Sequence, residues 1–392
     1  MDLFAKCYAP SLADEYREKG IYPYFRALET RQGPEVIMEG KRRIMLGSNN
    51  YLGLTSCPEV VEAGIRALEE FGTGCSGSRF LNGTLTMHLE LEAELAKFLR
   101  KEAAMTFSTG FQSNLGIISA LVGRSDYMIL DRENHASIYD GTRLSFGKML
   151  RYRHSDMDDL ERCLKQVPET AGALIITDGV FSMGGDIADL PHIVKLARQY
   201  GARVMVDDAH GLGTIGEGGR GTASHFGLEK EVDVYMGTFS KSLASLGGYM
   251  AAEARVVDYV RHCSRPFIFS ASIPPSSCAT ALAALKHLEA HPELPLRLDH
   301  LGDYFRTALK SRGLAIRESR TPIVPIFTYT MDRTMTVAKE LYENGVYVNT
   351  VLPPAAPADG CMLRTSLMAT HTEALLDEAA DVLQRVLEAH HE

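Results

Sequence analysis

Residues 173–206 read ALIITDGVFSMGGDIADLPHIVKLARQYGARVMV, and this stretch decides the fold class. The apolar runs at its two ends are continuous and rich in β-branched residues, as expected for strands that are covered on both faces. Between them, Pro191 to Tyr200 predicts a helix, because Asp189 precedes it, proline suits a first helical turn and Gly201 ends it. A strand, a helix and a strand in this order predict a mostly parallel, doubly wound sheet.

The same alternation of short apolar runs and helical patterns extends on both sides of this stretch. It predicts strands at Ala103–Phe107, Tyr127–Leu130, Ala173–Thr177, Arg203–Val206, Val232–Met236 and Gly247–Ala251. The sequence therefore predicts an α/β fold with three parts, which are an N-terminal segment at 1–45, a large domain at 46–280 and a small C-terminal domain at 281–392.

The small domain is predicted to be a compact α/β unit. Its expected elements are helices at Tyr304–Arg312 and Thr334–Asn344, strands at Ile323–Tyr329 and Val346–Val351, and a terminal helix. Thr370-His371-Thr372-Glu373 resembles a capping box for the terminal helix. In that helix, one face is expected to hold Leu375, Ala379, Val382 and Val386.

Composition bounds the class of protein. The 392 residues are 45% hydrophobic and 23% charged, which is ordinary for a globular chain. A net charge of −9 argues against a nucleic-acid partner, because phosphate binding needs a basic field. Seven cysteines without a C-x-x-C pair fit a reducing cytosol. The polar first twenty residues are no secretory signal, and no run of eighteen apolar residues predicts a membrane span. We expect a cytoplasmic enzyme that meets any lipid-like substrate in solution or peripherally at the inner membrane surface.

Lys241 is the first candidate for chemistry. It lies in Gly237-Thr238-Phe239-Ser240-Lys241-Ser242, directly after an apolar strand. A lysine among small hydroxyl residues at a strand end can form an imine with a carbonyl group, while the hydroxyls hold a phosphate. A lone Ser-Lys pair more often belongs to a solvated loop, so this interpretation depends on other sites.

The second candidate is Val206-Asp207-Asp208-Ala209-His210. Two acids and a histidine at the end of a buried strand are costly without partners, and ligands of open α/β sheets bind at the carboxyl ends of strands. Asp207 can keep a pyridine nitrogen protonated, and His210 can donate to a phenolic oxygen of the same ring. A metal site or a buried structural pair are the alternatives.

Two further motifs also follow predicted strands. Residues 107–114, FSTGFQSN, lead into a helix whose start presents free amides and a positive dipole end, which suits a phosphate. No G-x-x-x-x-G-K-[ST] motif occurs. Residues 131–137, DRENHAS, place His135 where an imidazole can stack on a ring. The ordinary alternatives are a capped helix for the first motif and a surface histidine for the second.

In this order, the motifs resemble the α-oxoamine synthase family of fold-type I enzymes that depend on pyridoxal phosphate (PLP). The resemblance extends from Ser48-Asn49-Asn50-Tyr51-Leu52-Gly53-Leu54 to Leu363-Arg364-Thr365-Ser366. It implies a large domain with a mostly parallel sheet, a smaller C-terminal α/β domain, PLP as cofactor and a homodimer with shared active sites.

The resemblance also implies a role for each site residue. The catalytic set is Lys241 as the Schiff-base lysine, Asp207 at the pyridine nitrogen, His210 at the phenolic oxygen and His135 stacked on the ring. Further cofactor contacts are implied for Ser108, Gly110, Phe111, Ser182, Thr238 and Ser240, and for Ser270 and Ala271, which resemble the segment that reaches the partner subunit's phosphate. Arg364 matches the arginine that meets the amino-acid carboxylate, with Asn49 as its companion. No metal is implied.

Within the family, several loops resemble those of bacterial serine palmitoyltransferases. They are Ile21–Arg26, Ser78–Thr84, Pro353–Pro357 and Leu367–Thr372. Two positions depart from the pattern. Leu352 stands where some of these enzymes have an arginine, and Gly184 stands where many relatives have an aspartate. The first departure puts a second carboxylate contact in doubt.

The resemblance implies a decarboxylative condensation of L-serine with a long-chain acyl-CoA, which is the first step of sphingolipid biosynthesis. Lys241 would act as the general base at the serine Cα. Other α-oxoamine synthases, which use alanine or glycine and a different acyl-CoA, are the alternative. A catalytically silent subunit is disfavoured because Lys241 is present, and an aminotransferase or aldolase is disfavoured by the full set of motifs.

Overall fold

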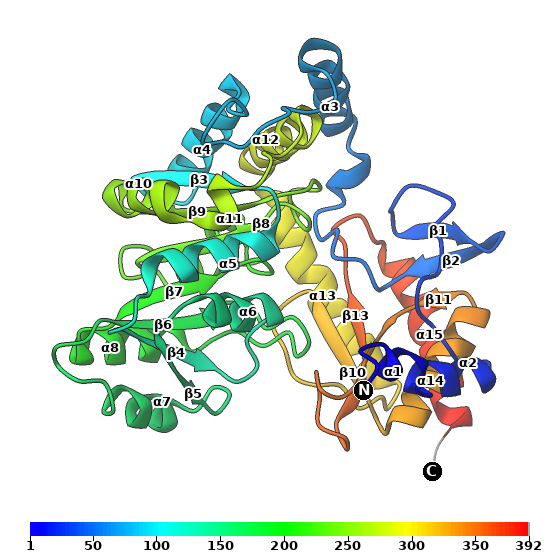
Figure 1. The fold of residues 1–392 in the computed structure, drawn as a ribbon. Coiled ribbons are helices and arrows are strands. Elements are labelled where there is room, and N and C mark those ends of the chain that lie inside the picture. Colours follow the sequence, from blue (N-terminus) through cyan, green and yellow to red (C-terminus); the bar gives the residue numbers. More distant parts are fainter. Residues whose placement is uncertain (391–392) are drawn as a thin grey trace.

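Seven strands form the central sheet of the larger lobe, on the left in Figure 1. Their order is β3-β9-β8-β7-β6-β4-β5, and all run parallel except β9, which is antiparallel to both of its neighbours. The computed structural model describes residues 1–390. The strands are β3 (Ala103–Phe107), β4 (Tyr127–Asp131), β5 (Lys148–Tyr152), β6 (Ala173–Asp178), β7 (Arg203–Asp207), β8 (Val234–Thr238) and β9 (Gly248–Ala252). The predicted α/β class with a mostly parallel sheet is confirmed.

The six predicted strands are all present, with ends shifted by at most two residues. The prediction missed β5, whose sequence is KMLRY. β5 is the edge strand next to β4, and of its five residues only Tyr152 is buried. An edge strand with one buried side chain produces no continuous apolar run, so its sequence carries little strand signal.

Each face of the sheet packs against its own layer of helices. On one face, Met105 and Met128 join a core with α5 (Gly110–Leu121), α6 (Ala136–Leu144), α10 (Ala254–Cys263) and α11 (Arg265–Ile268). On the other, Ala104 and Ile129 join a core with α4 (Thr86–Phe98), α7 (Met157–Leu164), α8 (Leu190–Tyr200) and α12 (Pro275–Ala290). Successive side chains of a strand point to opposite faces, so burial of both faces explains the continuous apolar runs.

The remaining helical elements complete this lobe. They are η1 (Leu54–Ser56), α3 (Pro58–Phe71), η2 (Glu217–Gly219) and α9 (Thr222–His225). α3 packs against α12 at the top of Figure 1.

The smaller lobe holds two three-stranded sheets. One has the order β10-β13-β12 and is antiparallel throughout. The other joins the N-terminal hairpin of β1 and β2 to β11, which pairs in parallel with β2. Their strands are β1 (Glu35–Met38), β2 (Lys41–Met45), β10 (Ile323–Tyr329), β11 (Val346–Tyr347), β12 (Asn349–Val351) and β13 (Cys361–Ser366). The lobe's helices are α1 (Ala5–Tyr8), α2 (Leu12–Glu18), α13 (Glu293–Ser311), α14 (Met331–Glu343) and α15 (Glu373–Ala389).

Three details of the predicted C-terminal part are wrong. The strand expected at 346–351 is divided between two sheets, with β11 in one and β12 in the other. The helix expected at 304–312 is the second half of α13. The cap of α15 is Thr372 rather than Thr370, since the Thr372 hydroxyl accepts from the Leu375 N–H at 3.2 Å. Across residues 1–390, no helix combines the length and the apolar character that a bilayer crossing requires.

Candidate active site

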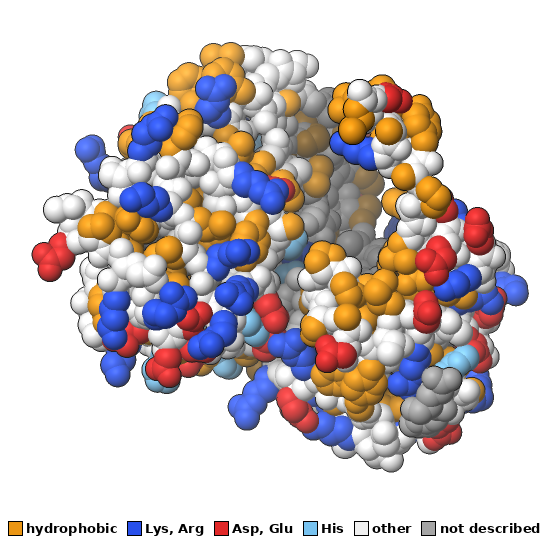
Figure 2. Space-filling view, turned by 60° about the horizontal axis from the view of Figure 1, so that its bottom comes forward, with side chains coloured by type: hydrophobic (Ala, Val, Ile, Leu, Met, Phe, Trp, Pro, Cys, Tyr) orange, Lys and Arg blue, Asp and Glu red, His pale blue; other side chains and the backbone are white. Residues whose placement is uncertain are grey.

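The predicted functional residues meet where the parallel strands of the large lobe end. The carboxyl ends of β4, β6, β7 and β8 lead into the segments that carry His135, Asp178, Asp207 and Lys241. A cavity of about 280 Å³ is lined by all four of them, and a second cavity of about 360 Å³ is lined by Arg364 and Asn49. His135, His210 and Lys241 line both cavities, so the two meet at the lysine. Figure 2 shows the surface hollowed between the two lobes.

Lys241 lies in the turn that follows β8. Desolvation lowers the pKa of its amine to about 8, with the positive charge of Arg364 acting in the same direction and the carboxylate of Asp207 opposing both. An amine with a pKa near neutrality is partly unprotonated, which is the form that attacks a carbonyl or accepts a proton. This desolvation could not be predicted from the local sequence around Lys241.

Asp207 and Asp208 are both buried, but they have different hydrogen-bond partners and different roles. Asp207 faces the smaller cavity, where its Oδ2 accepts from the Asn114 side-chain amide at 2.7 Å and its Oδ1 accepts from the Ala209 N–H at 3.1 Å. Asp208 faces away and accepts from the backbone and hydroxyl of Thr222 at 2.8 and 2.6 Å. Burial raises the pKa of Asp208 to about 6 despite these bonds. One acid is thus available to a ligand, while the other fixes the loop that follows.

His210 is buried and linked to the substrate side of the site through a tyrosine. Its Nδ1 lies 2.7 Å from the Tyr51 hydroxyl. Burial, with the positive charges of Lys241 and Arg364 nearby, lowers the pKa of His210 well below its ordinary value. The ring is therefore neutral, and Nε2 is the nitrogen left to contact a ligand.

His135 follows β4 and lies between the two cavities. Its Nδ1 is 2.7 Å from the Ser137 hydroxyl, and its backbone N–H donates to Asp178 at 3.2 Å. Burial lowers the pKa of the His135 ring, against the charge of Asp207. A neutral ring held at one nitrogen is suited to stacking, because its plane is fixed.

The start of α5 forms a cradle at one end of the smaller cavity. Thr109 caps the helix, with its hydroxyl accepting from the Gln112 N–H at 3.1 Å, and the first amides of a helix have no partner within it. A Cβ at Gly110 would lie 2.8 Å from the side chain of Thr238. The Thr238 and Ser240 hydroxyls are 2.9 Å apart and complete the cradle. This set of amides, hydroxyls and a dipole end suits a phosphate.

The remaining predicted contacts lie beside this cradle. The Ser108 hydroxyl donates to the Ala271 carbonyl, and the Gln112 amide donates to the Ser270 hydroxyl at 3.0 Å. Phe111 is half exposed on the first turn of α5. The segment predicted to reach a partner subunit therefore packs on its own chain at the start of α5.

Arg364 lies on β13 and is buried. Its Nε donates to the Ser182 carbonyl and its Nη1 to the Ser366 hydroxyl at 2.6 Å, while its Nη2 donates to Asn49 Oδ1 at 3.0 Å and to the Tyr51 hydroxyl at 3.1 Å. Four of its five N–H groups are thus engaged. Among the described residues, one Nη1 hydrogen and the Asn49 Nδ2 group have no acceptor. These two groups can share a substrate carboxylate.

The residues present fit PLP. The smaller cavity has a phosphate cradle at one end, a buried carboxylate for a pyridine nitrogen, a partly unprotonated amine for an aldehyde and an imidazole at the wall. Gly110 leaves the room at the cradle that a side chain would fill.

Comparison with known proteins agrees with this fit. The aminotransferase class I and II family matches residues 41–383. The chain belongs to this family.

Relatives within the family confirm the resemblance to α-oxoamine synthases. Serine palmitoyltransferase of Sphingobacterium spiritivorum is 51% identical over 96% of this chain and 94% of its own length, and that of Bacteroides thetaiotaomicron is 47% identical over 96% of both. An 8-amino-7-oxononanoate synthase of Bacillus velezensis is 45% identical over 95% of both. The solved structure of an S. paucimobilis serine palmitoyltransferase with a bound PLP–myriocin aldimine superposes with a TM-score of 0.96 at 38% identity, covering 99% of each chain.

Three residues of the site in this family member were not predicted. Asn114 fixes Asp207, Tyr51 joins His210 to Arg364, and Asp178 holds the backbone of His135. Asn114 and Tyr51 lie within motifs that the sequence analysis singled out, and Asp178 lies four residues before Ser182. Asp178, an acid at the end of a buried apolar strand, carried the same signal as Asp207.

Proposed function

We propose that the chain is a PLP-dependent serine palmitoyltransferase, which condenses L-serine with a long-chain acyl-CoA such as palmitoyl-CoA. The products are 3-ketosphinganine, CoA and CO₂, so the reaction is the first step of sphingolipid biosynthesis. The observation that carries this proposal is identity of 47–51% over nearly the full length to relatives of that name. The two cavities that meet at Lys241 support it.

In this proposal, each side of the site has its own task. The cofactor is held by Lys241, Asp207, His210 and His135 and by the cradle of Ser108, Gly110, Phe111, Thr238 and Ser240. Ser182, for which the resemblance implies a cofactor contact, lines the substrate cavity instead, and its carbonyl accepts from Arg364. When bound, PLP supplies an electron sink for the negative charge that develops at the amino-acid Cα. Asp207 maintains a proton at the pyridine nitrogen, because a buried carboxylate favours a positive partner.

Proton transfer falls to Lys241. Its lowered pKa lets the free amine take the Cα proton of serine, and it can return a proton after CO₂ leaves. Arg364 and Asn49 orient the serine carboxylate with the two donor groups that remain free. His210 donates from Nε2, which its bond to Tyr51 leaves available.

A third cavity has room for the acyl group. It measures about 610 Å³ and shares His135, Ser182 and Met183 with the substrate cavity. Its other lining includes Phe181, Phe327, Met362 and the loop from Pro354 to Pro357. The lining also includes the charged Arg132, Glu133 and Arg317, but the apolar side chains of Phe181, Met183, Phe327 and Met362 provide a surface on which a long acyl chain can pack.

The proposal extends to assembly and location. We propose a homodimer in which Ser270 and Ala271 also reach the partner subunit's phosphate. The exposed apolar side chains of Phe80, Leu81 and Phe269 near that segment support a buried interface there. We propose the cytoplasm, with peripheral contact at the inner membrane surface, as the location, since all seven cysteines are free thiols.

One panel tests the function. The PLP-loaded protein is titrated with L-serine, glycine, L-alanine and L-threonine, and acyl-CoAs of several chain lengths are then added while CoA release is followed. We expect serine to give the spectral change and long-chain acyl-CoA to give CoA release with formation of a ketone. Spectral change with glycine or alanine alone, and turnover of short acyl-CoA alone, would favour another α-oxoamine synthase activity and reject the proposal.

A further inference from the structure

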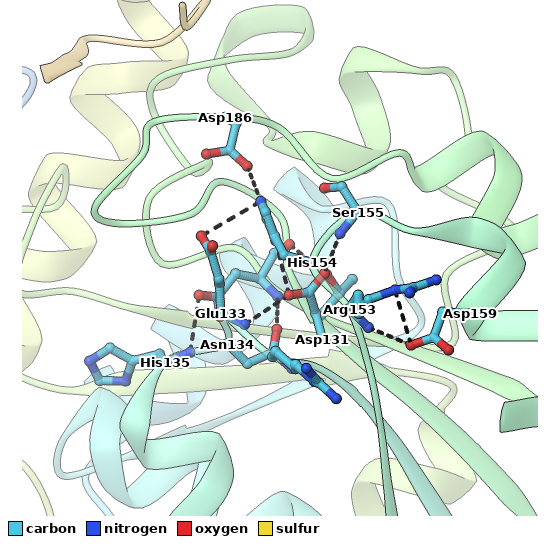
Figure 3. Close-up of polar contacts among 12 residues, drawn as sticks. Asp131, Glu133, Asn134, His135, Arg153, His154, Ser155, Asp159 and Asp186 are labelled. Carbon is cyan, nitrogen blue, oxygen red and sulfur yellow. Dashed lines mark hydrogen bonds and ion pairs between the residues drawn. The ribbon is translucent and has the colours of Figure 1, made fainter. Parts of the chain in front are cut away.

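His154 lines neither cavity of the site. It nevertheless connects two loops of the site, one that carries His135 and one that carries Ser182. It follows β5, the edge strand, and its ring is held at both nitrogens. Nδ1 lies 2.9 Å from Asp131 Oδ1, and Nε2 lies 2.8 Å from Asp186 Oδ2. Figure 3 shows the ring between these two carboxylates, with His135 projecting away at the far end of the Asp131 loop.

The contacts require a doubly protonated ring. An ionised carboxylate only accepts hydrogen bonds, so each nitrogen of His154 must donate. Burial lowers the pKa of His154, but the bonds to Asp131 and Asp186 outweigh it and leave the pKa at about 10. Burial likewise disfavours ionised Asp186, while His154 and Arg317 bring the pKa of that carboxyl below its ordinary value. His154 is therefore an imidazolium at neutral pH.

The contacts of Asp131 and Asp186 with His154 form a bridge between two loops. Its Asp131 end fixes the loop that leads to His135. Asp131 ends β4, and its carboxylate also accepts from the backbone N–H groups of Glu133 and Ser155 at 2.8 and 3.0 Å. Further along the same loop, Asn134 donates to the Ile176 carbonyl at 2.7 Å. This end is thus tied to the sheet by several bonds, and it provides a rigid anchor for His154.

The other end fixes a hairpin whose tip contacts Arg364. Asp186 lies in a turn in which the Phe181 N–H donates to the Asp186 carbonyl at 2.9 Å and the Gly185 N–H donates to the Phe181 carbonyl at 2.8 Å. Ser182 lies between these bonds, and its carbonyl accepts from Arg364 Nε. The His154 ring also packs edge-on against Phe181, with centroids 4.5 Å apart.

The charge of His154 compensates the carboxylates that surround its ring. Asp131, Asp186 and Glu133 all face its ring, with Glu133 Oε2 at 3.6 Å from Nε2. Arg317, from the smaller lobe, is the other nearby cation, at 3.1 Å from Asp186 and 3.9 Å from Glu133. Without His154, Asp186 and Glu133 would share Arg317, and Asp131 would keep only its backbone N–H donors. Like-charge repulsion and an unpaired buried carboxylate would then loosen the hairpin.

We propose that His154 is a positioning residue for the amino-acid carboxylate. It ties Asp186 to the rigid loop at Asp131, so that the Ser182 carbonyl holds Arg364 in the orientation that leaves one Nη1 hydrogen toward the substrate. This inference rests on the proposed function only in taking an amino acid as the ligand.

The test uses two variants and one matched control. His154→Gln keeps a donor of similar size but removes the charge, and Asp186→Asn removes the charge at the other end and provides a second variant if the first does not fold. His192→Gln is the control, because His192 forms an exposed pair with Asp189 at 2.6 Å, away from the site.

The decisive readout separates carboxylate binding from amine binding. Dissociation constants of the PLP-loaded protein are measured by absorbance for L-serine and for ethanolamine, which has the amine and hydroxyl of serine but no carboxylate. We expect both variants to bind serine about tenfold more weakly, the equivalent of one charge-assisted hydrogen bond, and ethanolamine within twofold of wild type. The double variant, with His154→Gln and Asp186→Asn, should bind serine no more weakly than either single variant, because the two residues act as one unit.

A second readout needs neither cofactor nor activity. Hydrogen exchange in the PLP-free protein should be faster in peptides covering residues 181–186 of both variants, and unchanged in His192→Gln. Equal loss of serine and ethanolamine binding would overturn the inference in favour of a general structural role, and so would unchanged serine binding. If wild-type protein bound no amino acid, the proposed function would fail, while the exchange data would still decide whether His154 holds the hairpin.

Discussion

The two halves of the site are built differently. The cofactor half takes Asp207, Lys241 and His135 from segments at the carboxyl ends of parallel strands in one sheet. The substrate half takes Arg364 from β13 of the smaller lobe and orients it through Ser182, Asn49 and Tyr51, which come from two separate segments of the chain. A single sheet fixes the first half locally, whereas the second depends on contacts between lobes. Changes in the first half should therefore affect cofactor and chemistry, and changes in the second should affect amino-acid binding.

The largest effect is expected for Lys241→Ala, in the cofactor half. Removal of the amine removes both the covalent attachment point and the base, so CoA release should fall by about 10²–10⁴-fold from loss of the base alone. The measurement is CoA release from serine and palmitoyl-CoA, together with the absorbance of the bound cofactor. A variant that folds and still makes product near the wild-type rate would remove Lys241 from the mechanism.

Arg364→Ala tests the substrate half. Loss of a charged hydrogen bond, at about 1.5–3 kcal/mol, should weaken L-serine binding by about 10–150-fold. Retention of PLP through dialysis should stay near wild type, because Arg364 does not line the cofactor cavity. Arg364→Lys is the matched control for charge. It should recover only part of the affinity, since the three donors of an ammonium cannot replace the four bonds of the planar guanidinium and also contact a carboxylate. Loss of PLP from Arg364→Ala would show that the halves are not separable.

Gly110→Ala should show the opposite pattern. The added Cβ would come within 2.8 Å of Thr238 in the phosphate cradle. Crowding at such a site costs about 1–3 kcal/mol, so we expect PLP to bind about tenfold more weakly. Serine binding to the fully loaded variant should change little. Cofactor titration by fluorescence measures the first quantity. Gly74→Ala, at an exposed position where an added Cβ would meet no atom within 4 Å, controls for the effect of an added methyl group.

Tyr51→Phe should affect both halves, because its hydroxyl contacts His210 and Arg364. Loss of a neutral hydrogen bond costs about 0.5–1.5 kcal/mol, so serine binding and turnover should each fall by about 2- to 12-fold. Separate measurement of KM and kcat shows whether the Tyr51 hydroxyl contributes to serine binding, to the chemical step or to both. An effect on KM alone would mean that the bond to His210 contributes nothing to the chemical step.

The same contrast explains what the sequence could predict. The cofactor half and the parallel sheet follow from local patterns, since its residues lie at the end of a buried apolar strand, as Asp207 does, or within a few residues after one, as Lys241 and His135 do. The links of the substrate half join residues far apart in the chain, such as Arg364 with Ser182 and His210 with Tyr51. No spacing or periodicity encodes such pairs. The resemblance supplied Arg364 and Asn49, but the bridge at His154 appears only in three dimensions.

The last prediction concerns pH, to which three histidines respond in opposite directions. His88 and His371 are buried, and burial lowers the pKa of each to about 4, while that of His154 is raised to about 10. The neutral rings accept from the backbone N–H groups of Leu85 and Met368 at 3.0 and 2.8 Å, bonds that protonation would break.

Each histidine makes the free energy of unfolding depend on pH, because its pKa differs between the native and the unfolded state. For His88 and His371, the unfolded state, with a pKa of about 6.5, is protonated before the native state, so stability is lost as pH falls from about 6.5 toward 4. For His154, the native state holds its proton longer, so its contribution is complete below about pH 6.5 and is lost as pH rises through about 10. Urea unfolding of the PLP-free protein should show the stability deficit of His154→Gln shrinking between pH 7 and 10. A deficit that stays constant over this range would mean that the ring is not charged in the native protein, and Asp186 would then lack the partner that ties the substrate half to the sheet.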